Sequence, residues 1–306
     1  YSAFLDFSRD FKFKPEEEEY LIHITTGSHV AQICLFLLTE SRHFPGSILQ
    51  TAPPRRHEDR SGNFDIIDLD LSKYDKTYIV PTIEEYVDFN IGGIHTIKSE
   101  DDSFTFFKCQ AYADRPAHAD NMHLDIWVAG ENYLRDSGTY KYNTEDILIN
   151  YFAGTAGHNS VMLDDQNQMT KGSRFIWFDW TKEVESKVFK SVENLSINTR
   201  AKMFPKVNGG VTHERTVTKN RSTLNWKIED IVSGKNAENM IRQLWHPNPQ
   251  LESRIGMKAI DENGEVLPKK VIDGWWSPYY GKREKVSVWV YETQGKSITT
   301  SIEIST

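Results

Sequence analysis

Three residues within one short stretch of the chain have side chains that bind borderline divalent metal ions. His118, Asp136 and His158 supply the imidazole and carboxylate ligands typical of zinc sites. The chain has no Gly-rich phosphate loop, no CxxC pair and no GxSxG nucleophile elbow, so few other segments could hold a reaction. We therefore expect residues 115–169 to hold part of any active site.

The residues around Asp136 predict a strand, a turn and a second strand. Apolar and polar residues alternate over Met122–Val128, and Gly130–Asn132 carry the turn signal. A three-residue turn pairs Val128 with Leu134, and it places Asp136 on the apolar side of the hairpin. A carboxylate in that position needs a cation or hydrogen-bond donors to offset its desolvation.

A second register is open to the same hairpin. With a two-residue turn, Asp125 stands opposite Asp136 and near His123, and two facing carboxylates need a metal or a shared proton. In either register, His118 reaches Asp136 only if the loop before the strand folds back across the sheet. His158 stands at the mouth of another strand, after glycines that allow a tight turn. A histidine in such a position is more often a hydrogen-bonded structural residue than a ligand.

The pattern of apolar residues along the chain predicts an all-β protein. A helical segment is expected from Pro15 to about Glu40, followed by a loop over residues 51–63. After that loop, short apolar or alternating runs recur between Gly, Asn, Asp and Pro turn signals. We expect a large antiparallel multi-sheet sandwich with a short N-terminal helical segment, divided into residues 1–62 and residues 63–306.

Composition excludes several classes of partner. The 306 residues carry a net charge of −8, which argues against a nucleic-acid partner because phosphate binding needs a basic face. No apolar run is long enough for a membrane span, and the N-terminus does not read as a signal peptide. The chain does not begin with Met, so we expect a piece of a longer protein. The cysteines, Cys34 and Cys109, predict neither a disulfide scaffold nor a zinc knuckle.

Several ordered motifs give the chain a resemblance to the heparinase II/III-like family of polysaccharide lyases. The motifs are the HAD at His118–Asp120, the strand MHLDIW with a glycine after it, DSGTY at Asp136–Tyr140, and HNSVMLDDQNQM at His158–Met169 followed by RFIWFDW. The resemblance implies an N-terminal α/α toroid followed by a β-supersandwich. The helical segment 1–62 would then be a remnant of the toroid or a link to it.

The same resemblance implies a function and a set of ligands. Family members cleave acidic, uronate-containing polysaccharides by β-elimination, and their sandwich holds a divalent metal, with zinc the expected ion. By motif, the metal ligands map onto His118, Asp136 and His158. The proton-transferring Tyr and His or Asn usually come from the toroid, outside this chain. The resemblance also implies a periplasmic or secreted location. A homo-oligomer is possible as well.

One departure from the family concerns the proton chemistry. Lyases of the family often read His-x-His-Ala-Asp, with the first His facing the substrate, whereas this chain has Pro116 there. A proline side chain can neither donate nor accept a proton. The alternative function is therefore a non-catalytic carbohydrate-binding or structural metal module in polysaccharide handling or assembly.

Other residues are candidates for binding the glycan. We predict substrate contacts from Arg115, which suits a sugar carboxylate, from Tyr140, and from Trp275 in the aromatic segment GWWSPYYG. Each has an ordinary structural reading, as an ion pair, a hydrogen-bonded tyrosine or the edge of a sandwich. A weaker third function is glycoside hydrolysis by the carboxylates Asp164–Asp165, but adjacent residues point in different directions.

Overall fold

The structure, a computed structural model, describes residues 2–23, 35–36, 38–39, 44–52, 63–67, 85–89, 92–173 and 175–306. The chain divides into two compact units, Tyr1–Thr82 and Ile83–Thr306. This boundary lies later than the predicted one at 62/63, because the strand that follows residue 62 pairs within the first unit. Within the described residues, no helix is long and apolar enough to cross a membrane.

Among its described residues, the first unit has the complete helix α1, helical residues at 35–36 and 38–39, and a three-stranded sheet. Its elements are α1 (Ser2–Asp10), β1 (Leu21–His23), β2 (Ser47–Ala52) and β3 (Asn63–Ile67). Strand β1 is parallel to β2, and β3 is antiparallel to β2. The prediction of a helix from Pro15 to about Glu40 is wrong at β1, and residues 24–34 of that range lie outside the described part. Here the β-branched and apolar residues Leu21 and Ile22 pair with a strand instead of continuing a helix.

The second unit is a sandwich of antiparallel sheets, as predicted. Its five-stranded sheet has consecutive neighbours, which are β4 (Tyr86–Phe89), β5 (Ile94–Lys98), β6 (Ser103–Lys108), β7 (His123–Val128) and β8 (Glu131–Leu134). The seven-stranded sheet has the order β12 (Val184–Lys190), β13 (Asn194–Met203), β14 (Val211–Asn220), β15 (Asn225–Ser233), β21 (Ser297–Ile304), β17 (Ile255–Asp261) and β18 (Val266–Leu267).

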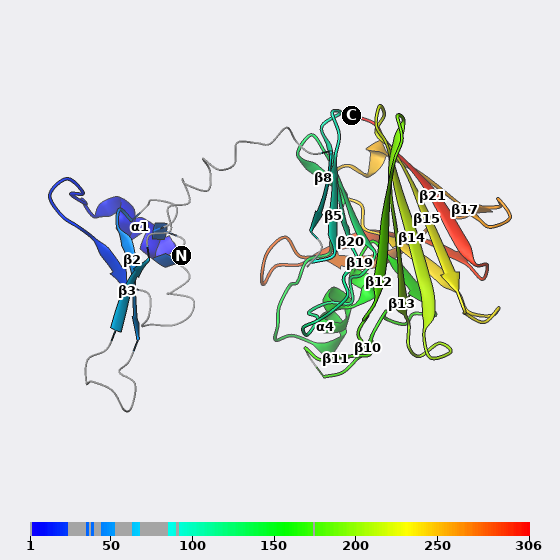
Figure 1. Cartoon of the computed structure of the whole chain (residues 1–306), viewed down its shortest axis with the longest axis horizontal. Helices are drawn as coiled ribbons and strands as arrows, with labels where there is room; N and C mark the ends of the chain where they lie inside the picture. The colour runs from blue at the N-terminus through cyan, green and yellow to red at the C-terminus, as the bar shows by residue number, and fades with distance from the viewer. Residues whose placement is uncertain are drawn as a thin grey trace. The chain divides into compact units, whose positions relative to one another are not determined.

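Smaller elements complete the second unit. The four-stranded sheet has the order β19 (Lys270–Trp276), β20 (Glu284–Thr293), β16 (Ile241–Trp245) and β9 (Val161–Leu163), and a two-stranded ribbon joins β10 (Thr170–Lys171) to β11 (Trp177–Phe178). The helical pieces are α4 (Asp146–Ala153) and single 3-10 turns at Thr155–Gly157 and Glu252–Arg254. Figure 1 shows the five-stranded and seven-stranded sheets facing each other, with α4 and the ribbon at one end.

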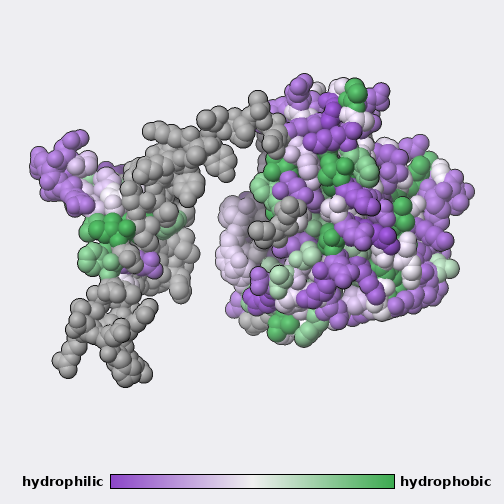
Figure 2. All heavy atoms as spheres, viewed as in Figure 1, coloured by the Kyte–Doolittle hydropathy of each residue, from purple (hydrophilic) through white to green (hydrophobic). Residues whose placement is uncertain are grey.

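Strict alternation of side chains builds the core between the sheets. Along β14 every second residue is buried, from Val211 to Lys219, while the residues between them face outward. The main core draws apolar side chains from all three large sheets, and Trp226 on β15 also donates a hydrogen bond to Thr105 on β6 at 2.8 Å. Hydrophilic residues cover most of the visible face of this unit (Figure 2).

A buried ionic cluster crosses this core. Arg215 and Asp230 are fully buried, and the guanidinium donates from Nε and Nη2 to the two carboxylate oxygens at 2.7 and 2.8 Å. His213 and Gln243 each contact the same carboxylate at 2.7 Å. Burial alone would raise the pKa of Asp230, but Arg215 and His213 outweigh it and hold that pKa well below its usual range.

The lowered pKa of Asp230 predicts a dependence of stability on pH. Its ionised form stabilises the fold fully above the ordinary carboxyl pKa of about 3.9, and this contribution is lost as the pH falls through the lowered folded-state value. We expect Asp230→Asn to be less stable than wild type at pH 7 and to lose less stability between pH 6 and pH 3. Urea unfolding followed by tryptophan fluorescence measures the free energy of unfolding of each protein as a function of pH. Parallel pH profiles for the two proteins would contradict the expectation.

Candidate metal centre

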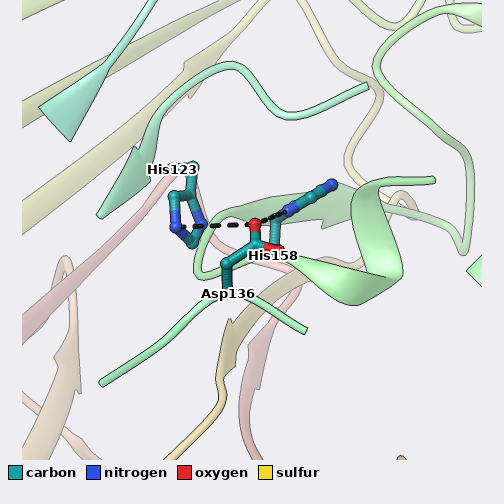
Figure 3. Close-up of side chains that lie close together, drawn as sticks. All are labelled: His123, Asp136 and His158. Atoms are coloured by element: carbon teal, nitrogen blue, oxygen red, sulfur yellow. Dashed lines mark hydrogen bonds and ion pairs between the residues drawn. The ribbon is translucent and has the colours of Figure 1, made fainter. Parts of the chain in front are cut away.

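The candidate centre lies where three segments meet at one end of the five-stranded sheet. His123 begins β7, Asp136 follows the end of β8, and His158 lies just before β9. One ligand atom from each of these residues lies within 4.8 Å of the others. The Asp136 carboxylate lies between the two imidazole rings (Figure 3).

Asp136 is held as a carboxylate by its neighbours. Its Oδ2 lies 2.7 Å from His158 Nδ1 and 3.7 Å from His123 Nε2, and its Oδ1 accepts a hydrogen bond from the Gly138 N–H at 2.6 Å. Burial raises its pKa, but the two histidines and the Gly138 N–H outweigh burial and lower it well below the usual range. The ionised carboxylate is the form that binds a metal ion.

His158 has one ring nitrogen in contact with Asp136 and one without a partner. The side chain is fully buried, and its Nε2 has no hydrogen-bond partner. A buried polar atom without a partner costs free energy unless something binds it. Gly157 makes room for this arrangement, because a Cβ there would lie 2.8 Å from the Tyr151 carbonyl oxygen and 2.5 Å from Ser137 Oγ. Close packing, rather than a left-handed backbone, therefore requires the glycine before His158.

His123 is already committed to two hydrogen bonds. Its Nδ1 accepts the Asn159 backbone N–H at 3.0 Å, so the neutral ring carries its proton on Nε2, which donates to Asp125 at 2.9 Å. Asp125 and Asp136 favour the charged ring and raise its pKa, although burial opposes them. The Asn159 N–H opposes a second proton on Nδ1. His123 can ligate through Nε2 only if it gives up its bond to Asp125.

His118 lies beside His158, with their ring centroids 5.5 Å apart. Burial lowers its pKa, and so does His158, which keeps the imidazole neutral as a metal ligand requires. Of the three predicted ligands, the structure thus joins Asp136 to His158 and sets His118 beside them. His123 was missed as a ligand candidate, although its place beside Asp136 in one predicted register was the available signal.

The hairpin turn explains why His123 comes close to Asp136. Strand β7 turns into β8 through Ala129 and Gly130, both with positive φ, so that Val128 pairs with Glu131. The three-residue turn is therefore wrong, because a two-residue turn of this hand matches the twist of the strands. A bulge then shifts the register, and Asp125 accepts hydrogen bonds from His123 and from Asn132 rather than facing Asp136.

One buried guanidinium holds the backbone on both sides of the centre. Arg215 Nη1 donates to the carbonyl of Met122 at 2.5 Å and to the carbonyl of Asn159 at 2.7 Å. Met122 precedes His123, and Asn159 follows His158. The Asn159 side chain adds hydrogen bonds from Nδ2 to the carbonyls of Leu124 and Arg135. A residue of the seven-stranded sheet therefore holds the two loops that carry His123 and His158.

The predicted substrate residues differ in exposure. Arg115 is exposed and lines a cavity of about 340 Å³ that His118 also lines. The side chain of Tyr140 is buried, and that of Trp275 is half-buried. The Arg283 guanidinium lies 5.3 Å from the centroid of the Tyr140 ring and 4.3 Å from that of Trp275. These two rings therefore pack mainly against protein groups, and their contact with a glycan remains a prediction.

The carboxylates considered for hydrolysis have structural partners. Asp164 and Asp165 both adopt positive φ in the turn after β9. Asp164 accepts hydrogen bonds from the Met240 N–H and the Asn239 side chain, and Asp165 pairs with Arg242. These contacts account for both side chains as parts of a turn.

Comparison with known proteins identifies the class of the second unit. Residues 82–305 match the family model described as heparinase II/III-like, C-terminal. A solved heparinase III superposes with a TM-score of 0.58 at 20% identity over 72% of this chain and 36% of that one. The heparan sulfate lyase HepC from Pedobacter heparinus gives 0.59 at 14% identity, over 78% of this chain and 42% of that one. At such identities the superpositions show a common fold.

The chain thus belongs to the heparinase II/III-like C-terminal family, as its motifs predicted. It spans less than half of the solved lyases that it matches.

The first unit is similar to a different protein. Residues 1–84 match the family model described as regulator of RNA terminal phosphate cyclase. The transcriptional regulatory protein RtcR of Escherichia coli (strain K12) is 47% identical over 100 residues, which are 31% of this chain and 19% of that protein. Because this similarity is to a small part of the regulator, it identifies a segment and not an activity. The derivation of residues 1–62 from a toroid remains a prediction.

Proposed function

We propose that the second unit is the metal-bearing sandwich of a polysaccharide lyase that acts by β-elimination on an acidic, uronate-containing glycan. The observation that carries the proposal is the contact between the Asp136 carboxylate and His158 Nδ1 at 2.7 Å, within a family whose solved members include lyases. A periplasmic or secreted location belongs to the same proposal.

The residues of the centre fit a divalent ion, and zinc is the expected one. The donor set is the ionised carboxylate of Asp136 with imidazole nitrogens, and an ion bound by both Asp136 and His158 would take the place of the proton between His158 Nδ1 and Asp136. Asp136 and His158 would hold the metal, and His118 would be the third ligand because its ring is not committed as that of His123 is. When bound, the ion supplies positive charge that ties the loops of these three residues together.

This chain's own groups would then position the glycan rather than carry all the proton transfer. Arg115 stands at the cavity beside His118 and can pair with the uronate carboxylate, which acidifies the C5 proton that β-elimination removes. Asp125 and the Asn159 N–H hold His123 in one orientation beside Asp136. The groups that remove the C5 proton and protonate the leaving O4 would come from a preceding toroid.

Pro116 favours a second candidate function. It is a buried residue at the position where lyases of the family often have a histidine, and it offers no group for proton transfer. If the reaction needs that histidine, the sandwich serves as a non-catalytic carbohydrate-binding or structural metal module. Its metal centre and glycan contacts would be the same as in the lyase.

The absorbance of the unsaturated uronate product separates the two functions. The zinc-loaded full chain is mixed with a lyase toroid, or fused to one, and a uronate polymer is added. We expect the ultraviolet absorbance to rise as the unsaturated product forms. The matched control is the same protein with Asp136→Asn, which removes the ionised ligand at nearly constant shape. No rise in absorbance over a panel of uronate polymers would overturn the lyase function and leave the binding module.

A further inference from the structure

Three exposed aromatic side chains form a continuous row on the surface of the second unit. Tyr142, Phe175 and Tyr280 are 58%, 41% and 62% exposed. The Tyr142 ring centroid lies 5.7 Å from that of Phe175 and 5.6 Å from that of Tyr280. Large exposed apolar side chains that gather in one place mark a binding surface more often than scattered ones do. We call these three residues the aromatic row.

The row is built from three separate loops, two of which are joined by a hydrogen bond. Tyr142 follows β8, Phe175 lies between β10 and β11, and Tyr280 lies between β19 and β20. The Gly281 N–H donates to the Tyr140 carbonyl at 2.9 Å, which fixes the loop of Tyr280 to the segment that carries Tyr142.

The same segment is tied to the metal centre. The Ser277 N–H donates to the Ser137 carbonyl at 2.7 Å, and the Gly138 N–H donates to Asp136 at 2.6 Å. Gly138 has φ +85, and a Cβ there would lie 2.3 Å from the Ser277 carbonyl oxygen, so only glycine lets the two loops approach. These contacts connect the loops of Tyr142 and Tyr280 to Asp136.

The row continues into the cavity of about 340 Å³ described above. Tyr142 and Phe175 line this cavity together with Arg115, His118 and Lys141. The volume lies near the lower end of the range for small-molecule sites, roughly 300–1,000 Å³, and suits one sugar unit. A ligand in the cavity would lie beside His118 and could extend onto the row.

The charge of the cavity contrasts with that of the chain. Its described lining includes the cations Arg115 and Lys141 and no carboxylate, although the whole chain carries a net charge of −8. An acidic protein that keeps a cationic cavity attracts an anionic ligand there and repels it elsewhere. Aromatic rings add flat apolar faces that suit the C–H faces of a pyranose ring.

We propose that the aromatic row and this cavity bind two neighbouring units of an anionic oligosaccharide. The carboxylate or sulfate of one unit lies against Arg115 and Lys141, and the ring of the next stacks on Tyr142 and Tyr280. The site is distinct from the predicted contacts at Tyr140 and Trp275, whose rings Arg283 covers. The proposal rests on the proposed function for its ligand class, but it requires neither a bound metal nor cleavage.

Calorimetric titration of the full chain tests this site. The probe is a tetrasaccharide of alternating glucuronate and N-acetylglucosamine. One control is the same tetrasaccharide with each carboxylate reduced to an alcohol. The other control is a sulfated form of that reduced tetrasaccharide. We expect Tyr142→Ala and Tyr280→Ala each to weaken binding of the charged probe roughly 10-fold. The matched control is Tyr279→Ala, because Tyr279 is 64% exposed in the same loop but its ring lies against Lys282.

A second variant tests the charge. Arg115→Gln is expected to weaken the charged probe roughly 10-fold and to leave the reduced one unchanged, since only the ionic contact is lost. Recovery of affinity with the sulfated form would assign the site to sulfate as well as carboxylate. Circular dichroism confirms that these surface variants fold.

Two results would overturn the site: equal affinity for the charged and reduced probes, or full affinity in both tyrosine variants. Failure of the lyase function is distinguishable, because tight binding without any unsaturated product leaves the site intact. Conversely, product formation with undiminished affinity in both tyrosine variants would uphold the lyase and reject this site.

Discussion

Replacing Arg215 by methionine is expected to destabilise the second unit by about 3–5 kcal/mol, the cost of removing one partner from a buried ion pair. The change removes the guanidinium from the buried carboxylate of Asp230 and leaves it in contact with His213 and Gln243. It also leaves the carbonyls of Met122 and Asn159 without their shared donor. Urea unfolding followed by tryptophan fluorescence measures the loss.

Arg242 offers a matched control on the same sandwich. It pairs with Asp165 and Glu292, but its side chain is 31% exposed, so Arg242→Met is expected to cost less than about 1 kcal/mol. Similar losses in the two variants would show that burial does not set the value of these ion pairs. Such a result would contradict the role assigned to Arg215.

Replacing His118 by glutamine is expected to weaken zinc binding at least 100-fold, whereas His123→Gln is expected to weaken it by roughly 10-fold or less. The reason is that the first substitution removes a proposed metal ligand, whereas glutamine at position 123 keeps an N–H donor for Asp125. Competition with a fluorescent zinc chelator measures both affinities.

His95→Gln controls for the loss of a buried histidine elsewhere. His95 contacts the Tyr86 hydroxyl at 2.8 Å in the five-stranded sheet, away from the three clustered residues. Zinc affinity in this variant should equal that of wild type. The opposite ranking of the His118 and His123 variants would make His123 the ligand and would refute the tautomer argument.

The sequence predicted the sandwich well where one face of a strand is continuously apolar. Among the apolar or alternating runs that predict strands, those at residues 211–217, 224–232 and 298–304 correspond to β14, β15 and β21. Strand β12 was missed because it has the edge position in its sheet and is mostly exposed, and β13 was missed because Thr199 and Ala201 interrupt its apolar face. The helix α4 was also missed.

The centre could be predicted only in part, for reasons of register. Motifs predicted Asp136 and His158, and the structure brings these two into contact. The third residue of the cluster depends on a bulge in the β7–β8 hairpin, which the sequence does not signal. The role of Arg215 was likewise out of reach, because the guanidinium crosses from one sheet to loops that lie far away in the sequence.

The two units of the chain resemble two different proteins. The candidate metal centre and the aromatic row both lie within residues 83–306, the part that matches the heparinase II/III-like C-terminal family. Neither needs a residue from the first unit. The properties proposed for the sandwich can therefore be measured on the full chain without assigning a role to residues 1–82.

Metal content is the most direct test of the central claim, that Asp136 and His158 hold a divalent ion. Purified full chain, dialysed against zinc and then against metal-free buffer, should retain about one zinc per chain by mass spectrometry of the elements. The Asp136→Asn, His158→Gln double variant, once circular dichroism has shown that it is folded, should retain almost no zinc. Equal zinc in the two proteins, or none in the wild type, would contradict the account.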